Sequence, residues 1–504
     1  MKKTFYILPL LLINLAALAV NYPANVQNVL RKAGNNRSEL EAVLMHYQPD
    51  SLKYKAACFL IGNMDIHYSQ TYYWADSLGH AVVFNELSYP DFSSSQIAFN
   101  SLREHTRGIH PVPVRIPDIQ TVGRNFLIDN IERAFLAWKK KAGGVSFEDF
   151  CEYILPYRIS VEPLQAWRGK YEKQFAWLPD SLAARSSGEA CAFFDRLINK
   201  EFENLYYKGI TRKEPLPRLG AVQLQFRKKG LCEDAADYGV FMLRSQGYPA
   251  SVDYIPYWAT SSGSHTLWHI DNVNTHSEFD LALKLSTQMP VFGREPSKVI
   301  RTTYARQPNV LANIEAQENI PDNFLRMYNY KDVTAEYWPV KSLSCKLDTS
   351  ATGRMVYACV LNYQKWEPTW WAQARADSAE FDNMTLGVVY LPAFYKQGQL
   401  LPAGYPVALG YNNKMVLQPD TDAKRYVVIE EQDKYLKFRP GKRYTLLYWD
   451  KKWKELETQT ADTDTHRLYF NHVPGNALLI LIPDYSEYKE RPFIITDEGT
   501  RVWF

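Results

Sequence analysis

The chain has 504 residues, of which 46% are hydrophobic and 22% are charged, and its formal net charge is +3. This composition excludes a disordered chain, and the length favours three or four domains over a single core. The near-neutral charge and the absence of a long basic run argue against nucleic acid as a partner.

The first 19 residues have the pattern of a secretory signal peptide. Lys2 and Lys3 precede an apolar stretch at residues 5–12, and Ala17-Leu18-Ala19 follows as a small-residue cleavage site. We therefore expect a mature protein that starts near Val20 and is exported to the periplasm or the cell surface. The apolar stretch is too short to cross a bilayer, and no later window is apolar for long enough, so no transmembrane segment is predicted.

Residues 20–215 predict a mainly helical N-terminal region. Ser38-Glu39-Leu40-Glu41 resembles a capping box at the start of one helix, and Asp50 is placed to cap the next. Residues 65–117, rich in Ser, Tyr, Pro and His, interrupt the helical pattern. We expect them to form a long surface excursion that lines a cleft.

Residues 216–336 predict a compact core made of one helix followed by strands. The helix begins at Cys232 and ends in Gly247-Tyr248-Pro249-Ala250, and strands are expected at 251–258, 265–271 and 278–283. Residues 337–430 and 431–504 then show short alternating apolar runs separated by turn residues. They predict two antiparallel β-sandwich modules, so the chain as a whole has the α+β fold class.

The six cysteines are widely spaced, which argues against a dense disulfide framework. Cys58 and Cys151 lie inside apolar helical patterns and are predicted to be buried core thiols. No CxxC pair is present, so a structural zinc site is not expected. No cofactor is implied by the sequence.

Cys232 is the candidate nucleophile. A thiol attacks as its thiolate, and the unpaired N–H groups and the macrodipole of a helix N-terminus favour that anion. The same N–H groups are suited to receive the oxyanion of a tetrahedral intermediate. Glu233 and Asp234 suit helix initiation but oppose thiolate formation, so a neighbouring imidazolium is needed for activation.

His265 is the candidate base and Asp280 the residue that orients it. His265 starts a predicted strand after a Gly/Ser-rich loop, and Asp280 falls within a residue or two of it if the two strands form a hairpin. His269 is a rival base. A metal site formed by His265, His269 and His276 is the alternative, which no HExxH-type spacing supports.

Two aromatic clusters flank this segment. Tyr254, Tyr257 and Trp258 precede the histidine loop, and we expect them to line the substrate cleft together with Trp268. The second cluster, at residues 366–371, is more simply explained by core packing.

Residues 216–285 resemble the transglutaminase-like superfamily, a papain-like group whose triad runs Cys, His, Asp along the chain. The resemblance rests on Gly230-x-Cys232, on the segment ending in Gly247-Tyr248-Pro249-Ala250, on His265 at the start of a strand and on Asp280. It implies thiol chemistry on an amide with no calcium or other cofactor. Trp268 follows His265 by three positions where the family has two, and Ser251 stands where many members carry Arg.

The sequence thus predicts an exported cysteine-dependent amide or peptide hydrolase, or an acyltransferase, acting through Cys232, His265 and Asp280. Gln223 and Gln225 are candidates for the second oxyanion donor. The expected substrate is a protein, a peptide or a peptidoglycan-like amide. The alternative is a non-catalytic surface protein that binds glycan or peptide through its aromatic cleft and its β-modules.

Overall fold

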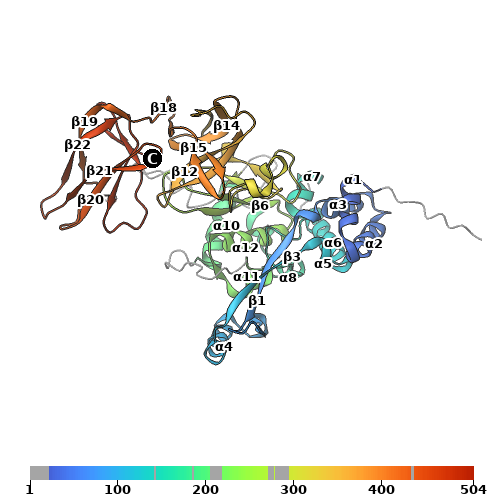
Figure 1. Cartoon of the computed structure of the whole chain (residues 1–504). Coiled ribbons are helices and arrows are strands. Elements are labelled where there is room, and N and C mark those ends of the chain that lie inside the picture. Colours follow the sequence, from blue (N-terminus) through green and yellow to red (C-terminus); the bar gives the residue numbers. More distant parts are fainter. Residues whose placement is uncertain are drawn as a thin grey trace, which may run out of the picture.

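The computed structural model describes residues 22–140, 144–183, 185, 187–204, 218–270, 277–278, 295–432 and 436–504. The chain runs from a helical N-terminal end to a C-terminal region of antiparallel sheets, which confirms the predicted α+β class (Figure 1). The predicted signal peptide lies outside the described residues. Within them, no helix combines the length and the apolar character that crossing a bilayer requires.

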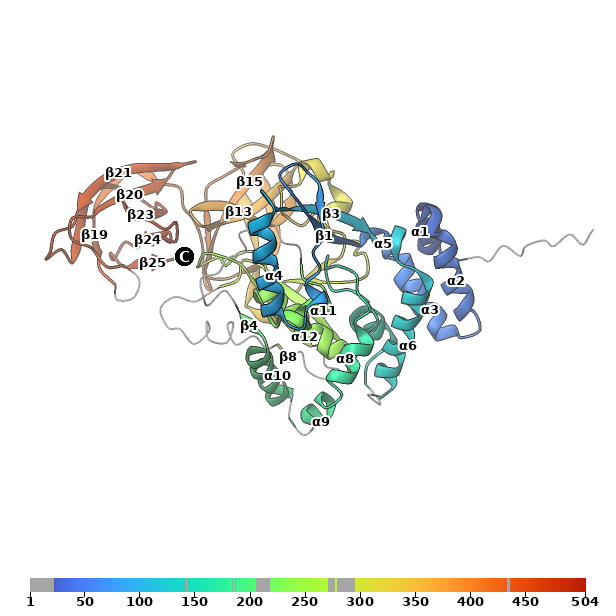
Figure 2. The same ribbon diagram turned by 90° about the horizontal axis from the view of Figure 1, so that it is seen from below.

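The N-terminal part is a helical bundle. Its elements are α1 (Ala24–Lys32), the short turn Gly34–Asn36, α2 (Arg37–Tyr47), α3 (Ser51–Gly62), the turn Met64–Ile66, α5 (Asp118–Thr121), α6 (Arg124–Lys140), α7 (Phe147–Asp149) and the π-helix Phe150–Ile154. The helices α1, α2, α3 and α6 lie side by side in both views (Figure 1, Figure 2). They bury one apolar core, to which Leu40, Ile61 and Phe150 contribute with no exposed surface.

Two of the predicted helix starts in this bundle can be compared with the structure. Asp50 caps α3 as predicted, because its carboxylate accepts a hydrogen bond from the Lys53 N–H at 3.1 Å. The predicted capping box at Ser38 is wrong. Here α2 already begins at Arg37, so Ser38 lies within the first turn and Asn36 occupies the cap position without a side-chain bond.

Residues 68–117 leave the bundle as the predicted excursion. β1 (Tyr68–Ala75) pairs with β3 (His110–Pro117) along its whole length and with β2 (Ala81–Val82), so the sheet order is β2-β1-β3. Between β2 and β3 the chain forms the short turn Glu86–Ser88 and α4 (Phe92–His105). The helix α4 lies far from the bundle at the end of β1 (Figure 1).

The central unit joins helices to a five-stranded sheet. Its helices are α8 (Arg168–Gln174), α9 (Leu178–Ala183), α10 (Ser187–Glu201), α11 (Ala221–Arg227), α12 (Cys232–Ser245), α14 (Leu311–Ile314) and α15 (Thr334–Tyr337), with the short turn Gln317–Asn319. Its antiparallel strands, in the order β10-β9-β6-β7-β8, are β6 (Ala250–Ile255), β7 (His265–Ile270), β8 (Ser277–Glu278), β9 (Ile300–Thr302) and β10 (Tyr330–Asp332). A short parallel pair, β4 (Glu203–Asn204) with β5 (Lys229–Gly230), precedes α12.

The reversal between α12 and β6 depends on Gly247. Its φ is +78°, a left-handed conformation that L side chains rarely adopt, and a Cβ at this position would collide with the Ala137 carbonyl of α6. Arg244 secures the same corner, because its Nε donates to the Ala250 carbonyl at 2.8 Å. The chain therefore returns along α12, which packs against both β6 and β7.

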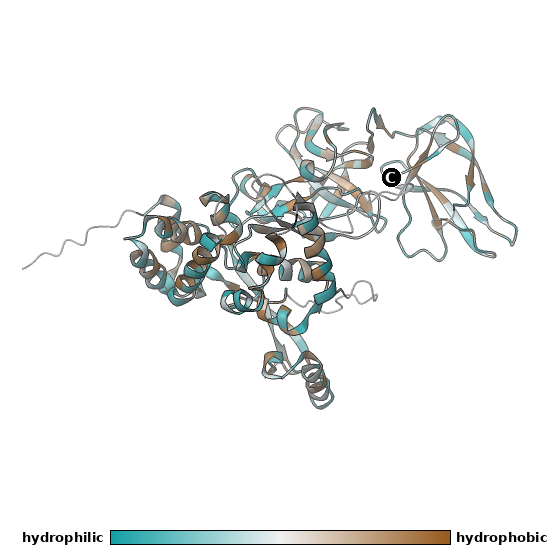
Figure 3. Cartoon of the chain, turned by 180° about the vertical axis from the view of Figure 1, so that it is seen from behind, coloured by the Kyte–Doolittle hydropathy of each residue, from teal (hydrophilic) through white to brown (hydrophobic). Residues whose placement is uncertain are grey.

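The C-terminal region contains the antiparallel strands that the sequence predicts. The first group is β11 (Val340–Lys346), β12 (Met355–Asn362), β13 (Lys365–Gln373), β14 (Ser378–Thr385), β15 (Val388–Lys396), β16 (Gln399–Pro402), β17 (Val407–Leu409) and β18 (Lys414–Val416). The second group is β19 (Asp420–Glu430), β20 (Arg443–Trp449), β21 (Trp453–Thr460), β22 (Arg467–Gly475), β23 (Leu479–Pro483), β24 (Phe493–Ile495) and β25 (Arg501–Trp503). Apolar and polar stretches alternate along these strands (Figure 3). Each group has an apolar core of its own, and a further core joins both groups to the central unit.

Buried charges lie behind α12. Arg158 and Asp118 form a paired contact with N···O distances of 2.5 and 2.6 Å, and both side chains are 1% exposed. Nearby, the fully buried Asp237 of α12 lies 3.6 Å from the Arg218 guanidinium, and neither of its carboxylate oxygens receives a hydrogen bond among the described residues. Burial raises the pKa of Asp237 to about 8; the negative charge of Glu162 adds to this, and Arg218 opposes it.

This elevated pKa predicts a specific pH dependence of stability. The pKa of Asp237 rises from its ordinary value of 3.8 to about 8 on folding, so folding takes up a proton, and the contribution of Asp237 to stability falls as the pH rises through this window. Asp237→Asn removes the titration. The melting temperature of the variant minus that of the wild type should therefore increase from about pH 5 to about pH 8. A difference that stays constant over this range would mean that Asp237 is ionised in the folded protein.

Candidate functional site

Cys232 is the first residue of α12. Leu231 before it has an extended backbone (φ −88°, ψ 179°), and its N–H donates to Oδ2 of the buried Asp234 at 2.9 Å, which fixes the helix start. The first N–H groups of an α-helix have no partner inside the helix. The thiol is thus attached where these N–H groups and the positive end of the helix dipole favour an anion.

The Cys232 thiol is accessible, in contrast to the other described cysteines. It is half-buried and donates a hydrogen bond to Glu233 Oε2 at 3.5 Å. The other four are buried free thiols, as predicted for the first two: Cys58, Cys151, Cys345 and Cys359. Burial raises the pKa of Cys151 and Cys345 to about 12. Among the described cysteines, only Cys232 combines access with a helix N-terminus.

His265 lies at the same end of the central unit as Cys232. It begins β7 and pairs with Ile255, the last residue of β6. The 14 residues of α12 span roughly 21 Å and the six of β6 roughly 20 Å. Since β6 returns along α12, the end of β6 and the start of β7 come level with the helix start that carries Cys232.

Trp258 supports His265 from inside the unit. Their rings are stacked, with centroids 6.0 Å apart and an interplanar angle of 21°. Only 3% of the Trp258 surface is exposed, because Trp258 also packs in a small apolar core with Ile255 and Leu267. Trp268 and His269 lie on β7, while their side chains, together with Asp271, His276 and Asp280, lie outside the described residues.

The loop that leads into His265 is held by a residue of the first C-terminal module. Asn362, buried at the end of β12, accepts a hydrogen bond from the Gly263 N–H at 3.2 Å and donates to the carbonyls of Gly263 and Trp258 at 3.0 and 3.3 Å. From the second module, Arg491 donates to the carbonyls of Ala259 and of Leu361. The position of the candidate base therefore depends on both modules.

Gln225 and Gln223 differ sharply in their surroundings. Both polar atoms of Gln223 are engaged, because Oε1 accepts from the Gly220 N–H at 2.9 Å and Nε2 donates to Glu86 at 2.7 Å. Gln225, seven residues before Cys232, is buried, and neither atom of its amide has a hydrogen-bond partner in the described part of the chain. A buried unpaired amide is costly to stability, by about 1–3 kcal/mol. Of the two predicted oxyanion donors, only Gln225 has an amide group without a partner among the described residues.

Comparisons of the sequence with models of known protein families and with curated proteins find no match. The resemblance to the transglutaminase-like superfamily consequently rests on residues 216–285 themselves. In that segment the structure has a helix that begins at Cys232 and a strand that begins at His265. The orienting acid of the resemblance, Asp280, is not among the described residues.

The contacts of Asn362 generate a prediction about the histidine loop. Asn362→Ala removes four hydrogen bonds to residues 258–263, at about 1 kcal/mol each. We expect faster amide hydrogen exchange in residues 256–266 and a change in the titration of His265 followed by NMR. Asn313→Ala is the matched control, because Asn313 also donates to two backbone carbonyls, at 2.8 and 3.0 Å, but these carbonyls belong to Gln307 and Pro308 and not to this loop. Equal exchange in the two variants would contradict the assignment.

Proposed function

We propose that the chain is a cysteine-dependent amide or peptide hydrolase, or an acyltransferase, of the transglutaminase-like type. The observation that carries the proposal is the accessible thiol of Cys232 at a helix N-terminus, with His265 at the same end of the unit. The unpaired amide of Gln225 supports it. The predicted signal peptide places this activity outside the cytoplasm, and the expected substrate is a protein, a peptide or a peptidoglycan-like amide.

In the proposed reaction, the sulfur of Cys232 attacks the carbonyl carbon of the amide while His265 takes the thiol proton. The N–H groups of the first turn of α12 and Nε2 of Gln225 stabilise the oxyanion. The C–N bond then breaks, His265 protonates the departing amine, and a thioester to Cys232 remains. Water, or a second amine, attacks the thioester with His265 as base, and the thiol is restored. Asp280 holds the imidazole in the required tautomer.

A second candidate function is a non-catalytic surface protein that binds glycan or peptide. The observation that favours it is the hydrogen bond from the Cys232 thiol to Glu233, because a carboxylate acceptor stabilises the protonated thiol and opposes the thiolate. A binding protein also needs no orienting acid. The two functions predict different reactivities for the sulfur of Cys232.

Alkylation of Cys232 by iodoacetamide between about pH 6 and pH 9 distinguishes these functions. An activated thiol should react roughly tenfold faster at about pH 6.5 than a free cysteine, because its larger thiolate fraction is only partly offset by lower nucleophilicity. His265→Ala should abolish that advantage and His269→Ala should not. Cys232→Ala identifies labelling elsewhere. A Cys232 that reacts like free cysteine at every pH would refute the thiol chemistry.

Gln225 gives a prediction in which stability and activity change in opposite directions. Gln225→Leu replaces an unpaired buried amide with an apolar side chain of similar size, so the melting temperature should rise. The same change removes an oxyanion donor, so kcat for amide cleavage should fall by about 10²- to 10³-fold while alkylation of Cys232 stays unchanged. Gln223→Leu is the control and should destabilise, because it breaks two hydrogen bonds. A Gln225→Leu variant with full activity would exclude this role.

A further inference from the structure

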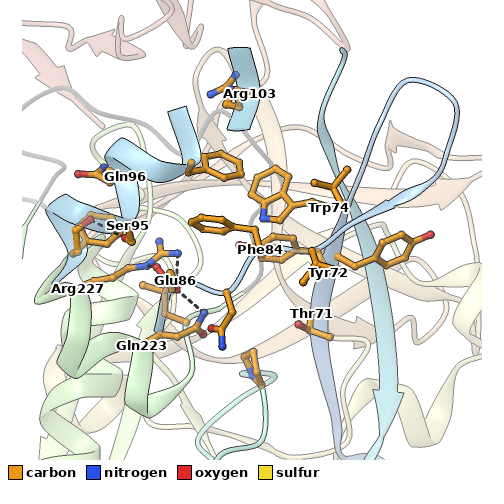
Figure 4. A pocket seen from close by; sticks show the side chains of 18 of the residues that line it. Thr71, Tyr72, Trp74, Phe84, Glu86, Ser95, Gln96, Arg103, Gln223 and Arg227 are labelled. Carbon is orange, nitrogen blue, oxygen red and sulfur yellow. Dashed lines mark hydrogen bonds and ion pairs between the residues drawn. The ribbon is translucent and has the colours of Figure 1, made fainter. Parts of the chain in front are cut away.

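A cavity of about 560 Å³ lies between the excursion and the central unit. One wall is formed by β1, the segment after β2 and α4, and the other by α11 with the residues before it (Figure 4). This size is within the range of small-molecule sites, about 300–1,000 Å³. None of the proposed catalytic residues lines it.

Aromatic side chains make the wall on the side of the excursion. Trp74 and Phe84 both pack on Phe99, with ring centroids 4.5 and 4.8 Å apart, and Tyr72 contacts the Trp74 edge at 5.1 Å. The rings of Tyr72, Trp74 and Phe84 lie close together on this wall (Figure 4). They form a continuous apolar surface that is only partly covered by protein. The faces of such rings can pack against the C–H groups on the face of a flat ligand.

The polar groups around this wall include two neutral amides and the exposed Arg103, whose guanidinium lies 6.0 Å from the centroid of the Phe99 ring. Gln96 and Asn100 occupy successive turns of α4 on the side that faces the cavity, and both are exposed. An amide side chain offers donors and acceptors together. On the floor, the charge of Glu86 is already matched, because its carboxylate accepts from Arg227 at 2.7 and 2.9 Å and from Gln223 (Figure 4). The floor therefore requires no charged ligand.

The edge of the excursion is unsuited to an extended peptide. β3 is an edge strand of its sheet, where a peptide would add by main-chain hydrogen bonds. Pro111, Pro113 and Pro117 share one side of β3 and have no N–H to donate. Strand addition on this edge is thus blocked, and recognition has to proceed through side chains in the cavity.

The cavity and Gln225 lie on opposite faces of α11. Gln223 and Arg227 are one turn apart and both line the cavity. Gln225 is two residues from each, which corresponds to about 200° around a helix, and it faces the buried interior. A ligand in the cavity therefore contacts the face of α11 opposite to Gln225.

We propose that this cavity binds a neutral carbohydrate. Its aromatic wall would pack against the apolar faces of sugar rings. Gln96, Asn100 and the other polar side chains at the mouth of the cavity would form hydrogen bonds with the hydroxyl groups of the sugar. This combination of exposed rings and neutral amides matches a ligand that is apolar on its faces and polar on its edges. The inference is independent of the thiol chemistry, since it concerns other residues and another face of α11.

The test is titration of the full mature chain with cellotriose, maltotriose, mannotriose and chitotriose, followed by calorimetry and by tryptophan fluorescence. At least one of these sugars should bind with a Kd below about 1 mM. Trp74→Ala should weaken that binding at least about tenfold, Trp74→Phe should retain part of it, and Asn100→Ala should weaken it without changing the melting temperature.

Tyr426→Ala is the matched control. Tyr426 is an exposed aromatic residue on β19, stacked on Tyr469 at 6.1 Å, and it belongs to the β-modules that were predicted to contact glycans. Binding that is lost in Tyr426→Ala and retained in Trp74→Ala would overturn the proposal. So would the absence of binding by all four sugars, or binding in the cavity of a capped neutral dipeptide in their place. None of these outcomes depends on whether Cys232 is reactive.

Discussion

The turn at Gly247 is the constraint on which the candidate site depends. Only a residue without a side chain fits there, because the backbone is left-handed and the Ala137 carbonyl of α6 occupies the space of a Cβ. This turn sends β6 back along α12 and so brings the start of β7 level with the start of the helix. Because α6 belongs to the N-terminal bundle, the bundle helps to determine where Cys232 and His265 lie.

The C-terminal modules also help to position the candidate site. Asn362 and Arg491 bond to the backbone of residues 258–263, and the ring of Trp258 in that loop stacks on the ring of His265. Three regions that are distant in sequence thus converge on one short loop. A role limited to targeting or adhesion does not fully describe these modules, because their side chains also hold the loop that precedes His265, the residue proposed as the base.

Local patterns in the sequence were sufficient for the helix and the strand that carry the candidate residues, but they did not predict the strands β1 and β3 of the excursion. The helix from Cys232 and its end at Gly247 follow from apolar spacing and from glycine conformation, and the strand at His265 follows from its alternation. The capping box at Ser38 failed because the turn Gly34–Asn36 runs directly into α2, so the helix begins before Ser38. The different fates of Gln223 and Gln225 were not predictable, because the partner of Gln223, Glu86, comes from an excursion 137 residues away in the sequence.

The contact of Glu86 with α11 also explains how two sites can exist so close together without competing. Arg227 and Gln223 bind the excursion through this one buried carboxylate, and the same short helix presents Gln225 to the interior. α11 has only seven residues, so once contacts fix one of its faces, the helix cannot rotate or shift much. Fixing the outer face therefore also fixes the orientation of the unpaired amide. If sugar binding stiffens the excursion, its effect on amide cleavage can pass to α11 through the bonds of Glu86 and through Phe92, which packs on Phe226 and Arg227.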